Sequence, residues 1–373
     1  MNIVHLSTTP LAGSPYSIST ALNRYTECNS RHICLESDTY GKRTYPSDLD
    51  WAKDKTKCLE LLELADIVHC HHVFHTENSP FGNLRKNCSK NVHFIRHYHA
   101  APSAIKKHKP YQEDLDECIS EEPLPSLVNA QHPERYFPKS KIVPNIILLD
   151  DPVFNKCGNH NTNTITFSPT FGNSAWFTND PDNRWNTKGA PETTSLLKKI
   201  TKDYDFDFDL IENSTWKECM LRRKNGILAI DELVTGSYHR SSLECLALGK
   251  TTLAFLDDRT QEVIKDISGT NNLPWVNTHL ENAYQDIEYL INNKYVLDAL
   301  GSESQYWMKK YWNPANLINI YLEAYENLNK LGDTLDKQRF DTHKKTMWSV
   351  KDKYDLLFKS ILARNKPVGK IYN

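Results

Sequence analysis

Short apolar runs alternate with longer stretches of helical periodicity through the first 150 residues. Two of the longer stretches, at residues 17–25 and 53–65, are predicted helices, and the second has Leu59, Leu62 and Leu64 on one side and charges on the other. The apolar runs are predicted strands at Ile3–Leu6, His32–Leu35, Ile67–His71, His93–His97 and Leu127–Ala130. Because strands that alternate with helices form parallel βαβ units, this half predicts a doubly wound sheet.

The same alternation resumes after residues 150–164, which contain Pro, Gly and several Asn without periodicity and are typical of a linker. Strands are predicted at Thr164–Ser168, Phe206–Ile211, Gly226–Ile230 and Thr252–Phe255, and helices at Glu192–Lys199, Thr215–Arg223 and Ser242–Leu248. From Leu280 the pattern is helical, with helices at Asn282–Asn292, Tyr295–Lys310, Ala315–Leu331 and Val350–Leu362. The chain therefore predicts an α/β protein with Rossmann-like domains at residues 1–149 and 150–312 and a helical, polar end at residues 313–373.

Composition excludes several classes of protein. The formal net charge of −2 gives no bulk attraction for nucleic acid, although it is compatible with a local basic groove. The nine cysteines are scattered singly, without a C-x-x-C pair, which argues against a disulfide framework and a zinc knuckle. No apolar run approaches the ~20 residues of a membrane helix, and the first residues resemble a buried strand rather than a signal peptide. We expect a cytoplasmic protein.

The turn after the first predicted strand is the first candidate for chemistry. It runs from Thr9 to Pro15, contains Gly13, and leads into a helix. A glycine there lets a ligand approach the backbone, and the helix start offers free N–H groups to anions. A plain strand–helix turn would have the same sequence. The pattern G-x-G-x-x-G is absent, which argues against an NAD site.

A second candidate follows the strand that ends at Ser168. The run Ser168-Pro169-Thr170 is followed, after a polar stretch, by Arg184, Lys188 and a helix start. Arg offers a forked donor and Lys a mobile point charge, so the pair suits a diphosphate. Two solvated cations on a loop are the alternative.

The third candidate is a glycine-bearing loop after the strand that ends near Ile230. The helix that follows carries Glu244, which we expect in its first turn. A carboxylate there accepts hydrogen bonds from a vicinal diol, as ribose requires, while the helix N–H groups meet phosphate. The alternative is that Glu244 is an acid at a helix start, where the helix dipole favours a negative charge, and that it has no role in binding.

Histidines gather on two neighbouring predicted strands. They are His69, His71, His72 and His75, followed by His93, His97 and His99. Imidazole is a common ligand of transition metals. Because neighbouring residues of a strand face opposite sides, and no carboxylate or thiol completes an obvious set, the pattern favours polar contacts to a sugar or phosphate over a metal site.

Together these segments resemble a GT-B-fold glycosyltransferase, most closely family 4, the retaining group that uses nucleotide-sugars. The resemblance covers about residues 1–330 and depends on the order of its motifs. These are Pro10–Pro15, Asp66–His69, Val143–Asn145, Ser168–Thr170, Lys188–Gly189, Ser242–Glu244 and Leu248–Lys250.

The resemblance implies a role for individual residues. Glu244 would hold the donor ribose, and Arg184 with Lys188 would neutralise the diphosphate and help it leave. Gly13 would face the donor phosphates, and His99, or less securely His97, would lie near the transferred sugar. Further donor-binding residues would be Ser168, Thr170, Gly236, Ser237, Tyr238, Ser242 and Leu243. Two domains would face a cleft, and a terminal helix around residues 307–328 would cross back to the first.

One departure from the family concerns the donor sugar. The family often carries an E-x7-E pair, and eight residues before Glu244 this chain has Gly236. Asp231 or Glu232 would then supply the missing carboxylate, or the backbone at residues 236–239 would hold the sugar. Because this glutamate is missing, a second interpretation stays open, in which the protein binds glycans but is catalytically inactive.

The implied reaction is transfer of a sugar from a nucleotide-sugar with retention, without metal or other cofactor. The acid-rich run Asp203–Asp209 is interpreted as the approach to a strand. Basic segments at residues 105–111 and 135–141 suit anionic headgroups, which favours a glycan or lipid-linked glycan acceptor in polysaccharide biosynthesis, with peripheral association at the inner membrane face. Solvated loops are the alternative. A phage-type DNA-base glycosyltransferase is an alternative that the net charge disfavours. A GT-B-like epimerase or phosphorylase also remains open.

Overall fold

The computed structural model describes residues 1–36, 45–100, 115–131, 137, 140–155, 162–169, 188–212 and 214–328. The predicted helix at residues 350–362, the basic segment at residues 105–111 and most of the segment at residues 135–141 lie outside the described residues. Among the described residues, no helix has the length and apolar composition that crossing a membrane requires.

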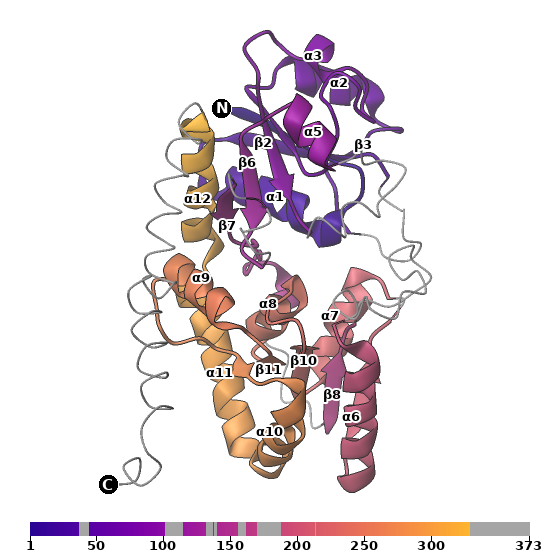
Figure 1. The fold of residues 1–373 in the computed structure, drawn as a ribbon, viewed down its shortest axis with the longest axis vertical. Coiled ribbons are helices and arrows are strands. Elements are labelled where there is room, and N and C mark those ends of the chain that lie inside the picture. The colour runs from indigo at the N-terminus through magenta and orange to yellow at the C-terminus, as the bar shows by residue number, and fades with distance from the viewer. Residues whose placement is uncertain are drawn as a thin grey trace, which may run out of the picture. The chain divides into compact units, whose positions relative to one another are not determined.

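Two parallel sheets, of seven and five strands, organise these residues (Figure 1). The first has the order β3-β2-β1-β4-β5-β6-β7, from β1 (Asn2–Ser7), β2 (Asn29–Cys34), β3 (Leu49–Asp50), β4 (Ile67–Cys70), β5 (His93–Tyr98), β6 (Ser126–Asn129) and β7 (Lys141–Val143). The second has the order β12-β11-β10-β8-β9, from β8 (Thr164–Phe167), β9 (Asp207–Leu210), β10 (Leu228–Glu232), β11 (Thr251–Ala254) and β12 (Val276–Asn277).

Helices connect the strands. In the first half they are the 3-10 turn η1 (Leu11–Gly13), α1 (Ser14–Tyr25), α2 (Lys55–Glu63), α3 (Leu84–Asn87), α5 (Leu115–Glu121) and the 3-10 turn η3 (Pro152–Phe154). In the second half they are α6 (Ala190–Asp203), α7 (Trp216–Asn225), α8 (Arg240–Ala247), α9 (Asp258–Ser268), α10 (Leu280–Asn292), α11 (Lys294–Tyr311) and α12 (Pro314–Glu326). The predicted α/β fold with two parallel sheets is confirmed, while the predicted domain boundaries stay predictions.

The last described helix, α12, returns to the first sheet, as expected. Its Tyr321 hydroxyl donates to the carbonyl of Pro144 over 2.8 Å, just after β7. On β7 itself, the Lys141 ammonium donates to the carboxylate of Glu323 over 2.7 Å. Helix α12 thus begins beside the second half of the chain and ends on the first.

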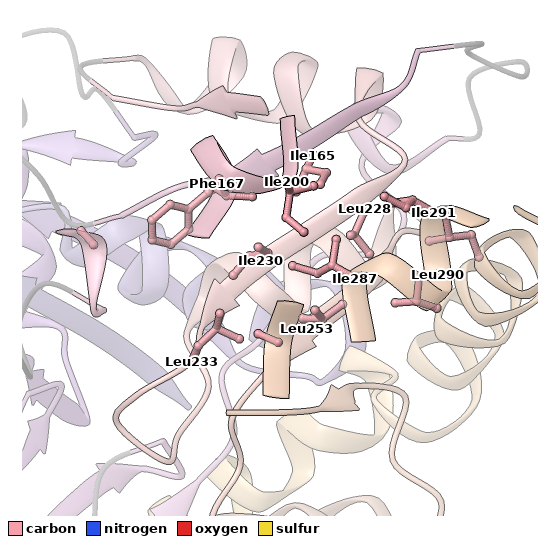
Figure 2. Packing of buried hydrophobic residues seen from close by; sticks show 14 residues of the cluster. Ile165, Phe167, Ile200, Leu228, Ile230, Leu233, Leu253, Ile287, Leu290 and Ile291 are labelled. Carbon is pink, nitrogen blue, oxygen red and sulfur yellow. The ribbon is translucent and has the colours of Figure 1, made fainter. Parts of the chain in front are cut away.

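The second sheet is held by an apolar core between its strands and helices. Figure 2 shows Ile165, Phe167, Ile230 and Leu253 of the sheet meeting Ile287 of α10. Burying each such side chain stabilises the fold by about 1.5–3 kcal/mol. This core sets the positions of the strands whose following loops carry the candidate site.

A glycine contact fixes helix α8 against α11. A Cβ atom on Gly301, in α11, would lie 2.4 Å from the carbonyl oxygen of Gly249, in the turn after α8. Real Cβ atoms do not approach an oxygen so closely, so only glycine permits this distance between the two elements. Since α8 carries Glu244, the contact also positions the candidate site.

The two faces of the first sheet differ in chemistry. Along β1, Val4 and Leu6 face an apolar core with α2 and α3, whereas His5 and Ser7 face the opposite side. The second face carries buried imidazoles from neighbouring strands, which are His5, His32, His69 and His97. We call these four residues, with His71 and His99 just after β4 and β5, the imidazole layer. Helix α12 covers part of it, because the ring of His69 meets Tyr325 and that of His97 meets Tyr321.

We expect Gly301→Ala to lower the free energy of unfolding by about 1–3 kcal/mol, since the added methyl group forces α11 away from α8. Helix propensity alone predicts that the same substitution raises the free energy of unfolding, because alanine is the better helix former. Denaturant unfolding would measure the change, with Ser302→Ala, an exposed neighbour on α11, as the control. A variant as stable as the wild type would contradict the close contact.

We also expect the protein to lose stability as the pH falls below about 6.5. Burial lowers the pKa of His32 to about 3, and burial with the neighbouring imidazoles lowers the pKa of His5, His69 and His71 well below the usual 6.5. Below pH 6.5 the unfolded chain therefore binds more protons than the folded one. Each imidazole that stays neutral then costs about 1.4 kcal/mol per pH unit.

Denaturant unfolding at pH 7, 6 and 5 measures this slope. His32→Gln should make the slope shallower, whereas His279→Gln, at a site whose side chain is 44% exposed, should leave it unchanged. Equal stability at pH 7 and pH 5 would show that the imidazole layer accepts protons without unfolding.

Candidate functional site

A cavity of about 300 Å³ lies between loops of the two halves. Its lining comes from the loops after β1, β6, β8, β9 and β10, and from α7, α8, the segment before β3 and the turn before α6. The lining residues are Ala12, Tyr45, Gln131, Ser168, Pro169, Lys188, Ile211, Ser214, Trp216, Cys219, Arg223, His239, Arg240, Ser241 and Glu244. Open α/β sheets bind ligands at the carboxyl ends of their strands, so this cavity is the candidate functional site.

The turn after β1 brings backbone to this cavity in an unusual conformation. Leu11, Ala12 and Gly13 have φ values of 47°, 53° and 77° in succession. Left-handed φ is costly for Leu and Ala, and such strain is concentrated at functional sites. The hydroxyl of Ser14, which follows, is buried and has no hydrogen-bond partner. The turn therefore offers unpaired polar groups beside the cavity.

Gly13 also makes room for Tyr45. A Cβ atom on Gly13 would lie 3.0 Å from Cδ1 of the Tyr45 ring. Burial, with the charge of Glu244 adding to it, raises the pKa of Tyr45 to about 12. A tyrosine from the first half thus lies close to a carboxylate of the second, and its hydroxyl is protonated at neutral pH.

Lys188 reaches the cavity from the turn before α6. Its φ is 55° and that of Gly189 is 60°, and a Cβ on Gly189 would lie 2.4 Å from a methyl group of Val234. The Lys188 side chain is buried, and its ammonium donates to Asp231 over 2.8 Å and to the Ser241 hydroxyl over 2.7 Å. The lysine predicted from sequence therefore has a fixed position.

Asp231 is the counter-ion that permits this burial. Its other oxygen accepts a hydrogen bond from the backbone N–H of His239 over 2.6 Å. Although burial by itself would raise the pKa of Asp231, the Lys188 ammonium beside it holds that pKa well below its usual range. The Asp231 carboxylate is therefore ionised at neutral pH.

Glu244 lines the cavity from helix α8. Its carboxylate accepts from the indole N–H of Trp216 over 3.0 Å, from Nε of Arg240 over 3.2 Å, and from Nη1 of Arg223. Helix α8 begins at Arg240, so Glu244 lies in its second turn. The expectation that it lies in the first turn is wrong, because the helix starts two residues earlier than the pattern indicated.

Arg240 links this carboxylate to the first half of the chain. Its Nη2 donates to the hydroxyl of Ser17 on α1 over 2.9 Å, and its Nη1 donates to the carbonyl of Ile146 over 3.0 Å. One guanidinium thus contacts α1, the segment that joins the halves, and Glu244.

The two carboxylates proposed to replace the missing family glutamate do not line the cavity. Glu232 is fully buried and accepts hydrogen bonds from the backbone N–H groups of Thr235 and Ser237 over 2.6 and 3.3 Å. It therefore shapes the loop around Gly236, whose φ is +80°. Asp231 is occupied by Lys188. The backbone at residues 236–239 stays a predicted contact of the donor sugar.

The other residues predicted after β10 mostly hold the loop in place through hydrogen bonds or burial and do not line the cavity. The Ser237 hydroxyl donates to the carbonyl of Gln131 over 2.6 Å, and that of Tyr238 donates to Asn145 over 3.2 Å. The Ser242 hydroxyl donates to the carbonyl of His239 over 2.9 Å, and Leu243 is fully buried. Of the predicted donor-binding residues, Ser168 and Glu244 line the cavity. Arg184 and Thr170 lie outside the described residues.

His99 and His97 belong to the imidazole layer and do not line the cavity. Nε2 of His97 pairs with Oδ1 of Asn129 over 3.0 Å, and Nδ2 of Asn129 pairs with Nδ1 of His99 over 2.9 Å. His97 is 1% exposed, whereas His99 is partly exposed, so His99 is the better placed of the two for contact with a ligand.

Sequence reasoning missed Arg223, Trp216, Arg240 and Tyr45. Arg223 lies within the run Arg222-Arg223-Lys224, in which residue type does not distinguish the buried residue from its partly buried neighbours. Periodicity with the apolar Met220 three residues earlier was the one available signal, since both side chains are buried on one side of α7.

No protein-family model matches the chain, and the search of curated proteins found no match. Solved structures do resemble it. One is an alpha-glucosyltransferase in complex with UDP and a 13-mer DNA containing an HMU base. It is 11% identical with a TM-score of 0.56, and the match covers 87% of this chain and 98% of the other.

Two further structures match over similar lengths. Anabaena HepE in complex with UDP is 10% identical with a TM-score of 0.51, over 88% of this chain and 100% of the other. A glycosyltransferase from Rickettsia africae is 11% identical with a TM-score of 0.50, over 88% of this chain and 98% of the other. At such identities the likeness shows the fold, and the chain has the two-sheet GT-B architecture of these glycosyltransferase structures.

Proposed function

We propose that the protein is a glycosyltransferase that moves a sugar from a nucleotide-sugar donor to an acceptor. The observation that carries this proposal is the cavity at the carboxyl edges of both sheets, where Glu244 lies with Lys188 and Arg223. A carboxylate suits a ribose diol and the cations suit a diphosphate. The fold likeness to structures that hold UDP supports a UDP-sugar as the first donor to test.

The charges around the cavity favour an anionic ligand. Lys188, Arg223 and Arg240 contribute +3, and Asp231 and Glu244 contribute −2, which leaves +1 among these five groups. The Lys188 ammonium has three N–H donors, of which Asp231 and Ser241 use two. The third is available to a phosphate oxygen. The left-handed turn before α1, with the unpartnered Ser14 hydroxyl, would supply further donors.

The reaction would break the bond between the anomeric carbon and the diphosphate oxygen. The acceptor oxygen would bond to that carbon on the same face, with retention as the family resemblance implies, and its proton would pass to the departing diphosphate oxygen. Negative charge grows on the departing diphosphate, and Lys188, with Arg184 as the resemblance implies, would stabilise it. This scheme needs no metal ion.

For the acceptor we keep a glycan or lipid-linked glycan, with the protein in the cytoplasm or peripheral at the inner membrane face. A modified DNA base is the second candidate, because one matching structure is a complex with DNA that contains an HMU base. Radiolabelled donor offered separately to DNA with hydroxymethylated bases and to glycan acceptors distinguishes the two. Donor binding without transfer to either would favour the inactive glycan-binding alternative.

The carboxylate of Glu244 should be required for tight binding of UDP. Glu244→Gln keeps the shape of the side chain but replaces a charged acceptor with a neutral one. Hydrogen bonds to charged groups are stronger by about 1–1.5 kcal/mol, so we expect UDP affinity to fall about tenfold. Calorimetric titration measures it, with Glu281→Gln, at an exposed position of α10, as the control.

The wild-type titration tests the proposal independently of any variant. No saturable binding of UDP, GDP or ADP, or of their sugars, to the folded protein would overturn the glycosyltransferase proposal. UDP binding of equal strength in Glu244→Gln would leave a nucleotide site but remove Glu244 from it.

Lys188 should contribute to turnover separately from its contribution to stability. Lys188→Met leaves the buried Asp231 without a counter-ion and should destabilise the fold by about 3–5 kcal/mol. Adding Asp231→Asn removes the unpaired charge and should restore most of that stability. Turnover should stay at least about a hundredfold below wild type in the double variant, because the cation that meets the leaving group is gone.

Thermal unfolding and steady-state kinetics on the two variants provide the comparison. If the double variant regains both stability and turnover, Lys188 acts only as a structural partner of Asp231. The matched control is Lys141→Met, which removes another buried lysine that pairs with a carboxylate, on β7.

A further inference from the structure

Three imidazoles of the imidazole layer meet at the junction of β1 and β4. One ring nitrogen from each of His5, His69 and His71 lies within 4.8 Å of the other two. His5 and His69 are paired in the parallel register of the two strands, and His71 follows β4. The three rings are at most 1% exposed. The objection that neighbouring strand residues face opposite sides does not apply, because His69 and His71 are two residues apart and share one face.

Two of their nitrogens have no partner. Nε2 of His5 and Nε2 of His69 are buried and make no hydrogen bond. A buried polar atom without a partner costs about 1–3 kcal/mol, and one such atom in a fold is commonly explained by a bound water or ion. Of the two, Nε2 of His69 is the atom left free once Nδ1 pairs with Tyr325, and it indicates a missing partner that completes the cluster.

The rings have the protonation state that a metal requires. The three side chains are at most 1% exposed, and burial away from water disfavours the charged form of an imidazole. Neutral imidazole is the form of histidine that ligates metal ions.

The outer nitrogens of the cluster have fixed partners. Nδ1 of His69 pairs with the Tyr325 hydroxyl over 2.8 Å, which leaves Nε2 as its inward atom. Nδ1 of His71 pairs with Nε2 of His99 over 2.8 Å, and His99 pairs in turn with Asn129. Such second partners orient ligating histidines and fix their tautomers.

The histidines of the cluster can take the tautomers that metal binding requires without a net gain or loss of protons. Nε2 of His71 and Nδ1 of His5 lie 2.8 Å apart and share one proton. If the Asn129 amide turns by 180°, its oxygen accepts from Nδ1 of His99, and Nε2 of His99 accepts from Nδ1 of His71. His71 then presents a free lone pair at Nε2, and His5 presents one at Nδ1 once its own proton lies on Nε2.

We propose that His5, His69 and His71 bind a late first-row transition-metal ion such as Zn²⁺. Three imidazoles suit Zn²⁺, Co²⁺ or copper and do not suit Mg²⁺ or Ca²⁺, which prefer oxygen. Within the described part of the chain, neither metal-binding group of histidines includes a carboxylate or thiolate. Three neutral imidazoles leave the positive charge of the ion uncompensated, so a small anion such as hydroxide would serve as the fourth ligand of a tetrahedral site. Through His69 and Tyr325 the ion would anchor α12 to the first sheet.

Zn²⁺ titration of the full chain, freed of metal by a chelator, tests the proposal. We expect one equivalent to bind with submicromolar affinity and to raise the midpoint of thermal unfolding. His5→Gln and His69→Gln should each weaken binding at least tenfold. His32→Gln, a buried imidazole of the same layer that pairs with Ser7 instead, is the matched control and should bind as the wild type does.

Co²⁺ bound to the wild type gives a readout that needs no variant. A tetrahedral visible spectrum, and X-ray absorption with three imidazole ligands, are expected. An octahedral spectrum with oxygen ligands, or no stoichiometric binding, would overturn the proposal. Binding that His97→Gln abolishes and His5→Gln leaves intact would also overturn it, since the ion would then lie among His71, His97 and His99. The outcome is independent of the proposed function, because these residues do not line the cavity.

Discussion

The buried carboxylate of Asp231 determines how the second half of the candidate site is arranged. It lies on β10 and accepts from Lys188, from the Ser241 hydroxyl over 2.6 Å and from the N–H of His239. An unpaired buried carboxylate is costly, so these donors are held around it. The turn before α6 and the start of α8 are thereby joined although more than 40 residues separate them. Because Asp231 fixes the start of α8, it also fixes the position of Glu244, which lies about one turn further along the helix.

The two halves of the chain meet around the cavity through polar contacts. Arg240 reaches Ser17 and Ile146, and Ser237 reaches Gln131. Near the segment that joins the halves, the indole N–H of Trp312 donates to the carbonyl of Asn145 over 3.0 Å. Polar interfaces of this kind exchange partners more readily than an apolar core does. The apolar clusters described above lie within one sheet or the other, so the contacts around the cavity are mainly polar.

Sequence patterns predicted the long elements well and the short ones poorly. Strands β1, β5 and β8 were predicted to within two residues, because their apolar runs are buried on both faces. Strands β3 and β12 have two residues each, too few to show any period, and α9 has a mostly polar sequence that hides its buried stripe. Lys188 and Glu244 were found because they lie beside glycine turns and helix starts. Tyr45 and Arg223 enter the site through tertiary contacts, which a local pattern does not contain.

The hydrogen bonds of Glu244 bear on how a donor would enter the cavity. A carboxylate has about four acceptor positions, and Trp216, Arg240 and Arg223 already occupy three of them. Under the proposed function a ribose diol needs two, so one of these donors has to leave. Arg240 has the longest of the three bonds to lose, and its other nitrogens contact Ser17 and Ile146. Its release from Glu244 would therefore change the contact that Arg240 makes between the halves.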